Sequence, residues 1–339
     1  MATFVVLSVV SLASQSLQGL CHLFDAKCSS QLSLRVGDSG VRGVFAEETV
    51  KPGTNVLQIP VGACLRDDAA NLQSDEWAVR LASCFLELKK NEKKSKAQQA
   101  WLALLPTDLK ESLPVHWDES LVRRCLSTDL DLAVDRSYFA RAEALYQLQT
   151  HSSEPECQYA LDIVQTRCCR FEPGIRLLAP IFDLLNHGGE QSNAEFFRDD
   201  DILVVRTTET VEAGFEVLID YGESARPAWK CLLNYGFVPS DDGRIELSFD
   251  GVEYSLGANS IPYELVESIS SKIGQAEVDL TPAVRTVLAE CATGMAGGNV
   301  RDDQEESTSR PEQLAKDLRL SRRLALLAFA DGMRECQDA

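Results

Sequence analysis

The sequence predicts an α+β fold in which small β-strands flank a block of helices. Residues 31–65 show short apolar alternation broken by turn residues, a pattern typical of strands. Residues 68–170 change to helical spacing, and strand alternation returns between residues 193 and 220. A mainly helical region follows residue 238. We therefore expect the helical block to be an insert within a β-rich unit.

Length and charge limit the classes of function. The chain has 339 residues, of which 45% are hydrophobic and 25% charged, as in ordinary globular proteins. This length allows two or three compact units. Lys and Arg number 33 against 52 Asp and Glu, so the net charge is −19. Such a charge repels phosphate backbones and attracts basic segments, so we expect a protein substrate that is basic around the target residue, and no direct nucleic-acid binding. We also expect a monomer.

Cysteines and the N-terminus bear on the compartment. None of the eleven cysteines has the Cys-x-x-Cys spacing of a zinc or thioredoxin-type site, so we expect reduced, mostly buried thiols in an intracellular protein. Residues 1–20 carry an apolar run, with no Lys or Arg before Lys27. They fit a secretory signal or a transit peptide only in part, so a buried helix and an inaccurate start site stay open. We expect a cytoplasmic or nuclear protein, with the plastid as the alternative, and no membrane association.

Individual elements follow from local patterns. Turn residues at 37–40 and 51–53 bound the strands expected at 41–46 and 55–59. Two sets of apolar residues recur at helical spacing. They are Trp77, Leu81, Phe85 and Leu88 in one helix, and Tyr138, Ala142, Leu145 and Leu148 in another. The lysine run at 89–96 is expected to be a solvated helix end or loop.

The second half of the chain again shows strand alternation followed by helical spacing. Strands are expected at 193–197, 202–207 and 215–220. A hairpin with Asp250-Gly251 at its turn and three helices are expected after residue 238. The hairpin strands are 245–249 and 252–256, and the helices are 261–273, 282–293 and 312–336. The polar stretch 294–311 is expected to be a linker.

Three short segments carry the residues that could do chemistry. They are 40–46 (Gly-Val-Arg-Gly-Val-Phe-Ala), 183–187 (Asp-Leu-Leu-Asn-His), and 216–222 (Glu-Val-Leu-Ile-Asp-Tyr-Gly) followed by 234–238 (Asn-Tyr-Gly-Phe-Val). Each alone has an ordinary structural interpretation: a hairpin turn for the glycines, a helix cap for the Asn-His pair, and core packing for the tyrosines. Their order and spacing are more specific than any one of them.

Taken together, these motifs resemble those of the SET-domain protein methyltransferases. More narrowly, they resemble the Rubisco large-subunit methyltransferase-like subgroup, whose SET domain is split by a helical insert. The resemblance covers residues 36–238. It implies a fold of small β-sheets with a knot-like threading, in which segments 183–187 and 216–222 cross.

The resemblance also implies domain boundaries. An uncertain apolar segment at 1–30 would precede a SET domain at 31–238, with its helical insert at about 68–165. Residues 239–339 would form a helical region that resembles a shortened substrate-binding domain. The zinc-binding cysteine cluster that follows many histone-directed SET domains has no counterpart, because only Cys291 and Cys336 lie beyond residue 238.

S-adenosylmethionine is the cofactor that the resemblance implies, and no metal is required. The positions that match the family's cofactor contacts are Val41, Arg42 and Val44 through their backbone, Arg167, Asp183, Asn186, His187 and Phe237. Asn186 and His187 match the residues that hold the adenine and amino-acid ends of the cofactor, and Phe237 matches the aromatic that packs on adenine. Arg167 is similar to an arginine that pairs with the cofactor carboxylate, with Arg170 as a rival.

Two tyrosines match the catalytic positions of the family. Tyr221 falls where the family has its catalytic tyrosine, and Tyr235 falls where a second tyrosine lines the lysine channel. A lysine ammonium, with a pKa of about 10.4, must lose a proton before it can attack, and a dry aromatic channel lowers that pKa. Attack on the methyl group must be in line, so most of the rate gain is expected from positioning.

The resemblance therefore implies a protein-lysine N-methyltransferase that acts on a non-histone protein. Two alternatives within this fold stay open: a histidine acceptor, and a catalytically silent SET domain that serves as a protein-binding module. A third interpretation takes Asp183, His187 and Glu190 as a metal or hydrolytic site, but Gly188-Gly189 would end any helix there. A dinucleotide-binding fold is disfavoured because no Gly-x-Gly-x-x-Gly follows a strand.

Overall fold

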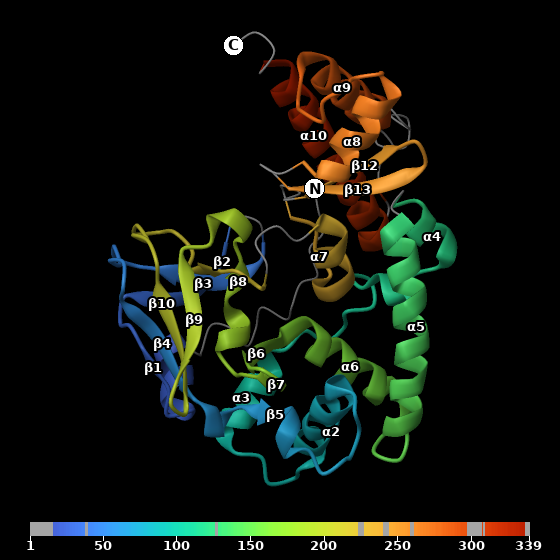
Figure 1. The fold of residues 1–339 in the computed structure, drawn as a ribbon. Coiled ribbons are helices and arrows are strands. Elements are labelled where there is room, and N and C mark those ends of the chain that lie inside the picture. The colour runs from blue at the N-terminus through green and yellow to red at the C-terminus, as the bar shows by residue number, and fades with distance from the viewer. Residues whose placement is uncertain are drawn as a thin grey trace. The chain divides into compact units, whose positions relative to one another are not determined.

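The computed structural model describes residues 16–37, 40–125, 128–222, 227–239, 244–257, 261–296, 307 and 309–335 (Figure 1). The chain forms two compact units. The first comprises Met1–Leu109 and Phe139–Gly222, and the second comprises Lys110–Tyr138 and Glu223–Ala339. Each is described by itself below.

The largest sheet of the first unit has six strands. Their order is β1 (Lys27–Cys28), β4 (Asn55–Pro60), β10 (Ile202–Thr207), β9 (Ala194–Asp199), β11 (Leu218–Ile219) and β8 (Asn186–His187). β11 runs parallel to both of its neighbours, and the other pairs are antiparallel. The strands predicted at 55–59, 193–197 and 202–207 are confirmed. The one predicted at 215–220 is shorter, because only two of its residues enter the sheet.

The glycine turn belongs to a β-hairpin that lies beside the segment leading into β11. β2 (Leu32–Val36) pairs with β3 (Arg42–Ala46), and the turn before β3 includes Gly40 at φ +76°. Val44 is buried, and its carbonyl accepts a hydrogen bond from the Val217 amide at 2.8 Å. Phe45 forms an isolated antiparallel bridge with Glu216. Segment 40–46 therefore lies beside the segment that precedes β11.

A three-stranded sheet corrects the prediction of helical structure as far as residue 170. β6 (Cys168–Glu172) and β7 (Ile175–Leu178) form a hairpin, and β7 also pairs with β5 (Leu65–Arg66). The hairpin turn contains Gly174 at φ +83°, a conformation that glycine adopts without steric cost. Cys168 leaves the preceding helix with an extended backbone, φ −76° and ψ 149°.

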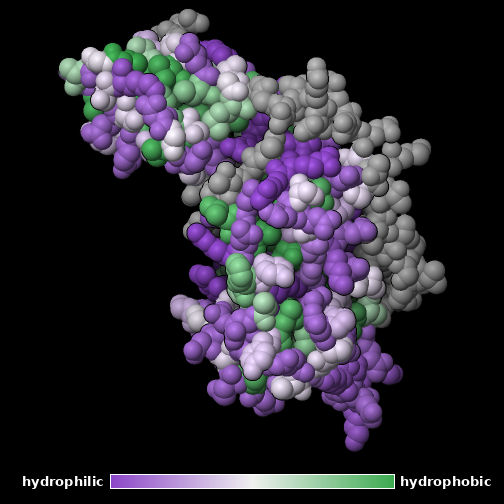
Figure 2. Space-filling view, turned by 90° about the vertical axis from the view of Figure 1, so that its right-hand side faces the viewer, coloured by the Kyte–Doolittle hydropathy of each residue, from purple (hydrophilic) through white to green (hydrophobic). Residues whose placement is uncertain are grey.

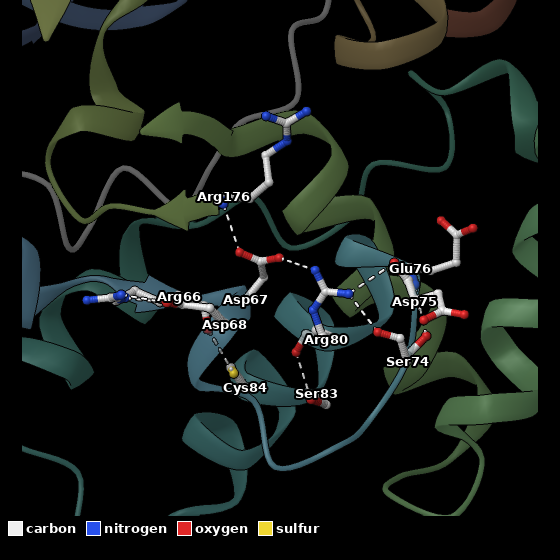
Figure 3. Close-up of polar contacts among 10 residues, drawn as sticks. All are labelled: Arg66, Asp67, Asp68, Ser74, Asp75, Glu76, Arg80, Ser83, Cys84 and Arg176. Carbon is white, nitrogen blue, oxygen red and sulfur yellow. Dashed lines mark hydrogen bonds and ion pairs between the residues drawn. The ribbon is translucent and has the colours of Figure 1, made fainter. Parts of the chain in front are cut away.

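A buried carboxylate connects this sheet to the first long helix. Asp67 is fully buried, accepts a hydrogen bond from the Arg176 amide at 2.8 Å, and pairs with Arg80 at 2.6 Å (Figure 3). Arg80 also donates to the carbonyls of Ser74 and Asp75 at 2.6 and 3.0 Å. Both oxygens of Asp67 therefore have donors, and the network fixes the loop before the helix.

Four complete helices and part of a fifth belong to the first unit. They are α1 (Leu17–Leu23), α2 (Trp77–Lys90), α3 (Lys96–Leu104), α6 (Glu154–Arg167) and the second half of α5 (Thr128–Leu148). Ser95 and Ser153 form capping boxes at the starts of α3 and α6. The predicted inner face of α2 is confirmed, since Leu81, Phe85 and Leu88 are buried. The lysine run begins at the exposed end of α2, as expected.

The predicted inner face of α5 is wrong in its first half. Tyr138 is 64% exposed, whereas Ala144 and Leu148 are buried. Arg141 lies among the inward residues and forms a buried ion pair with Asp162 of α6. A buried arginine is tolerated when a carboxylate pairs with it, so the inner face of this helix does not follow an apolar repeat.

α1 contributes to the core of the first unit. Leu17, Leu20 and Cys21 are each at most 2% exposed and pack into the cluster that also contains Leu32. Ser16 caps the helix by accepting from the Gly19 amide at 3.0 Å. Part of the apolar N-terminal segment is thus a buried helix, and residues 1–15 lie outside the described residues.

The second unit is mainly helical. Its described elements are α4 (Glu119–Arg123), the first half of α5, α7 (Ala228–Tyr235), β12 (Arg244–Phe249), β13 (Val252–Gly257), α8 (Tyr263–Lys272), α9 (Pro282–Ala296) and α10 (Arg310–Glu335). The predicted hairpin is confirmed, with Asp250 and Gly251 both at positive φ. The linker predicted at 294–311 is shorter, because α9 and α10 extend into it; most of the remainder lies outside the described residues.

The surface, the cysteines and the hydropathy of the helices can be compared with what the composition predicts. The face in Figure 2 is mostly hydrophilic, with apolar residues in small groups. Ten cysteines are described, and all are free thiols, five of them buried. Among the described helices, none combines the length and apolar character that crossing a membrane requires.

Candidate active site

The first unit brings together the three motif segments that precede residue 223. Asn186 and His187 form β8, which pairs in parallel with Leu218 and Ile219 of β11. The Gly188 amide continues this pairing with a 3.0 Å hydrogen bond to the Ile219 carbonyl. Segments 183–187 and 216–222, which the resemblance brings together in the threading of the fold, therefore lie side by side in this sheet.

Asn186 joins all three segments through its side chain. Its Nδ2 donates to the Arg42 carbonyl at 2.8 Å and to Glu216 Oε1 at 2.7 Å. A Cβ at position 43 would lie 1.8 Å from Glu216 Oε1 and 2.9 Å from Asn186 Nδ2. Gly43 is therefore required for this close approach. Burial raises the pKa of Glu216, and the hydrogen bond from Asn186 partly opposes that shift.

A second asparagine stabilises the same segment from the other side. Asn193 Nδ2 donates to the Glu216 carbonyl at 2.9 Å, and Asn193 Oδ1 accepts from the Leu218 amide at 2.9 Å. Neither Asn193 nor Glu216 is among the predicted site residues, although Glu216 begins the quoted segment 216–222. Their role depends on pairing between distant segments, which a single sequence does not display.

His187 and Tyr221 are held against each other. The Tyr221 amide donates to His187 Nδ1 at 3.2 Å, and the two ring centroids are 5.2 Å apart. Because Nδ1 accepts this bond, the neutral imidazole carries its proton on Nε2. The Tyr221 hydroxyl donates to the Leu185 carbonyl at 2.6 Å, which fixes its position. Asp220 Oδ1 lies 3.8 Å from His187 Nδ1.

Asp183 is at the centre of a neighbouring polar cluster. Its side chain is 1% exposed, and Trp101 of α3 donates to Oδ2 at 3.1 Å. Arg167 donates to the Asp183 carbonyl at 2.9 Å and lies 3.9 Å from Oδ2. Arg170, the rival position, is exposed on β6. Of the two arginines, Arg167 is the one that lies in the cluster.

Arg42 adds a second guanidinium to this region. Its Nη1 donates to the Leu104 carbonyl at the end of α3 at 2.9 Å. Burial lowers the pKa of Arg42, Asp183 opposes that effect, and the charge of Arg167 adds to it. Within the part of the chain that the structure describes, three buried atoms of this group have no hydrogen-bond partner: Arg42 Nε, Arg167 Nε and Asp183 Oδ1. Such atoms are rare in native proteins and favour a ligand that supplies both acceptors and donors.

The backbone groups predicted to contact a cofactor take part in the sheet edges. The carbonyls of Val41 and Val44 accept from the amides of Gly37 and Val217, both at 2.8 Å. Val41 is 47% exposed, whereas Val44 is 2% exposed. Of these two positions, Val41 is the one accessible to a ligand.

The remaining predicted residues belong to the second unit. Tyr235 ends α7, and Gly236 caps it at φ +77°. The rings of Tyr235 and Phe237 are stacked, with centroids 6.1 Å apart and an interplanar angle of 27°. A Cβ at Gly236 would lie 2.9 Å from Ser112 Cβ, so this turn also requires glycine. The two predicted catalytic tyrosines therefore divide between the two units.

The geometry does not favour the metal or hydrolytic interpretation of Asp183 and His187. Asp183 lies in a 3₁₀ turn (Phe182–Leu184) and His187 in β8, so they do not share a helix face. Their side chains have different partners, Trp101 for Asp183 and the Tyr221 amide for His187. In the described part of the chain, no group of three or more His, Cys, Asp or Glu residues could hold a metal ion.

Comparison with known proteins identifies the family. The SET-domain family model matches residues 41–222, more than half of the chain. SET domain-containing protein 8 of Schizosaccharomyces pombe is 25% identical over 231 residues, which cover 59% of this chain and 52% of that protein. The chain therefore spans about half the length of the curated relative it matches.

Solved structures agree on the fold. The SET domain of LSMT bound to lysine and AdoHcy has a TM-score of 0.64 at 14% identity, covering 94% of this chain and 90% of that one. Rubisco LSMT bound to AdoMet has a TM-score of 0.63 at 14% identity, covering 95% and 91%. The resemblance drawn from the three motifs is confirmed, and the chain belongs to the SET-domain family.

Proposed function

We propose that this protein is an S-adenosylmethionine-dependent protein methyltransferase with lysine as the acceptor residue. The observation that carries the proposal is the convergence of Asn186, His187 and Tyr221 in one unit of a SET-domain fold. The similar structures are bound to AdoMet, AdoHcy, lysine or methyllysine. These ligands are properties of those proteins, and they support the same chemistry here.

The cluster around Asp183 fits the amino-acid end of such a cofactor. Arg42 and Arg167 bring two positive charges against the one negative charge of Asp183, and each arginine has a buried Nε that no described residue pairs with. A carboxylate would neutralise the excess charge and accept from these donors. Asp183 Oδ1 could in turn accept from an N–H group. The residues present therefore fit an α-amino acid moiety.

Tyr221 fits the role of orienting the acceptor amine. Its hydroxyl is fixed by the Leu185 carbonyl and its ring by His187. When bound, the cofactor supplies the methyl group as an electrophile; the chain's own residues position the amine and exclude water. Proton loss from the lysine ammonium to solvent precedes attack, since a protonated amine has no lone pair.

The charge of the protein supports a basic segment around the target residue. The excess of acidic residues, 52 against 33, gives a long-range attraction for basic peptides and repels nucleic acid. A non-histone substrate is proposed because residues beyond 238 lack a zinc-binding cysteine cluster. We extend the proposal to a cytoplasmic or nuclear location.

The test is transfer of labelled methyl from S-adenosylmethionine into proteins of a cell extract. Tyr221→Phe is expected to reduce the label at least about tenfold, because it removes the hydroxyl that orients the amine. Tyr146→Phe is the matched control, since Tyr146 is 69% exposed on α5. Identification of the modified residue then distinguishes lysine from histidine.

Two outcomes would contradict the proposal. Equal labelling by wild type and Tyr221→Phe would exclude the assigned role of Tyr221. No labelling, together with no calorimetric binding of S-adenosylhomocysteine, would favour the silent-domain alternative instead.

A further inference from the structure

We propose that Glu216 is a positioning residue, which orients the Asn186 carboxamide so that its Oδ1 is the atom left to accept an N–H group of the cofactor. This inference rests on the proposed function and deepens it. It assigns to the site a residue that makes no direct contribution to methyl transfer. The resemblance already implies that Asn186 and His187 hold the two ends of the cofactor, and we take the N–H group to be the α-ammonium at its amino-acid end; the new assignment is the role of Glu216.

The first step is the hydrogen-bond inventory of Asn186. A carboxamide has two N–H donors and one carbonyl acceptor. Both donors are used, by the Arg42 carbonyl at 2.8 Å and by Glu216 Oε1 at 2.7 Å. A flipped carboxamide would place Oδ1 against these two oxygens, which would repel it. Among the described residues nothing donates to Oδ1, so this acceptor is available to a ligand.

The second step is that the chain is arranged to bring the Glu216 carboxylate to this point. A Cβ at residue 43 would lie 1.8 Å from Oε1 and 2.6 Å from Cδ, so the carboxylate occupies the space that a side chain would need. The backbone of Glu216 is also held, by the bridge to Phe45 and by Asn193, which donates to the Glu216 carbonyl at 2.9 Å. The carboxylate has no room to move away from Asn186 on the Gly43 side.

The third step is that a carboxylate is a costly choice for this position on structural grounds alone. Burial raises the pKa of Glu216, which means that the surroundings disfavour the charged form. A glutamine of the same shape could accept from Asn186 without that penalty. A negative charge beside Asn186 does, however, attract an ammonium group. Glu216 therefore fits recognition of a cationic N–H donor better than it fits stability.

The experiment compares two probes by calorimetry on the full chain. S-adenosylhomocysteine carries the amino-acid end, and 5′-methylthioadenosine lacks it. Glu216→Ala is expected to weaken S-adenosylhomocysteine at least about tenfold and 5′-methylthioadenosine by less than about threefold, since it releases the Asn186 carboxamide. Glu216→Gln, which keeps an acceptor for Asn186 but removes the charge, is expected to restore part of that loss. Glu195→Ala, at an exposed glutamate of β9, is the matched control.

A second variant keeps the test decisive if Glu216→Ala does not fold. Gly43→Ala leaves the carboxylate in the chain but displaces it, and its Cβ would also lie 2.9 Å from Asn186 Nδ2, so it is expected to disturb the same pair and to weaken the same probe selectively. Gly62→Ala is its control, because a Cβ there meets no atom within 4 Å. Circular dichroism and the melting temperature report folding for each variant.

Three results would overturn the inference. A folded Glu216→Ala that binds S-adenosylhomocysteine like wild type would show that Asn186 needs no orientation. Equal weakening of both probes would place the effect at the adenosine end. A Glu216→Gln as weak as Glu216→Ala would assign the effect to charge alone. Failure of the wild type to bind either probe is a different outcome, because it removes the proposed function itself.

Discussion

Two of the buried acidic networks of the first unit, one around Asp67 and one around Asp183, are built from the same residue types. The side chains are 0% and 1% exposed, and each has an arginine partner. Asp67 has a donor on both oxygens (Figure 3), whereas Asp183 Oδ1 and Arg167 Nε have no partner among the described residues. A network with every atom satisfied stabilises the fold. One that leaves buried donors and acceptors unsatisfied keeps binding capacity for a ligand.

The largest expected effect is loss of stability when the closed network is opened. Asp67→Ala should lower the free energy of unfolding by about 3–5 kcal/mol, because Arg80 loses a buried partner. Asp68→Ala is the matched control. Its pair with Arg66 is exposed, so the change should be about 0–1 kcal/mol. Urea unfolding followed by circular dichroism measures both. Equal midpoints would mean that the Asp67 network does not stabilise the fold.

A smaller effect, on binding, is expected in the open network. Arg167→Ala should weaken S-adenosylhomocysteine about tenfold to a hundredfold, because it removes a charged donor to the ligand carboxylate. Arg170→Ala, at an exposed position two residues into β6 and its hairpin, should leave the affinity unchanged. Calorimetry measures both. If the two variants bound alike, Arg167 would belong with the structural arginines, and the contrast with Asp67 would fail.

The fold was predictable where a local pattern determines it. The hairpin at Asp250-Gly251 needs two residues at positive φ, and the inner face of α2 follows from the spacing of Leu81, Phe85 and Leu88. β6 was missed because it follows α6 with no Gly or Pro between them. The inner face of α5 was missed because Arg141 is paired with Asp162 of another helix.

The site was predictable as a set of residues, and less so as a set of interactions. Asn186, His187 and Tyr221 follow from the motifs, and the structure places them together. The hydrogen bond from Asn186 to Glu216 depends on the absence of a Cβ at Gly43, which is far from both residues in the sequence. The selection of Arg167 over Arg170 depends on where α6 ends. Both features depend on tertiary structure, and neither produces a local pattern in the sequence.

The smallest expected effect concerns pH and extends the comparison to a third acid, Glu216, which lies outside both networks and accepts from Asn186. The pKa of Glu216 is raised above its ordinary value of 4.5 in the folded state, chiefly by burial. Below pH 4.5 both folded and unfolded chains hold this proton; as pH rises through the raised value, the unfolded chain has already ionised and stability is lost. Glu216→Gln removes that loss.

The melting temperature of Glu216→Gln minus that of wild type should therefore increase from pH 4 upward and level off once Glu216 is ionised in both states. Other groups titrate in both proteins and cancel in the difference, and Glu195→Gln, at an exposed position, should show no such trend. A difference in melting temperature that does not change with pH would mean that the pKa of Glu216 is not raised in the folded state. Glu216 would then serve Asn186 as an acceptor at no cost in stability.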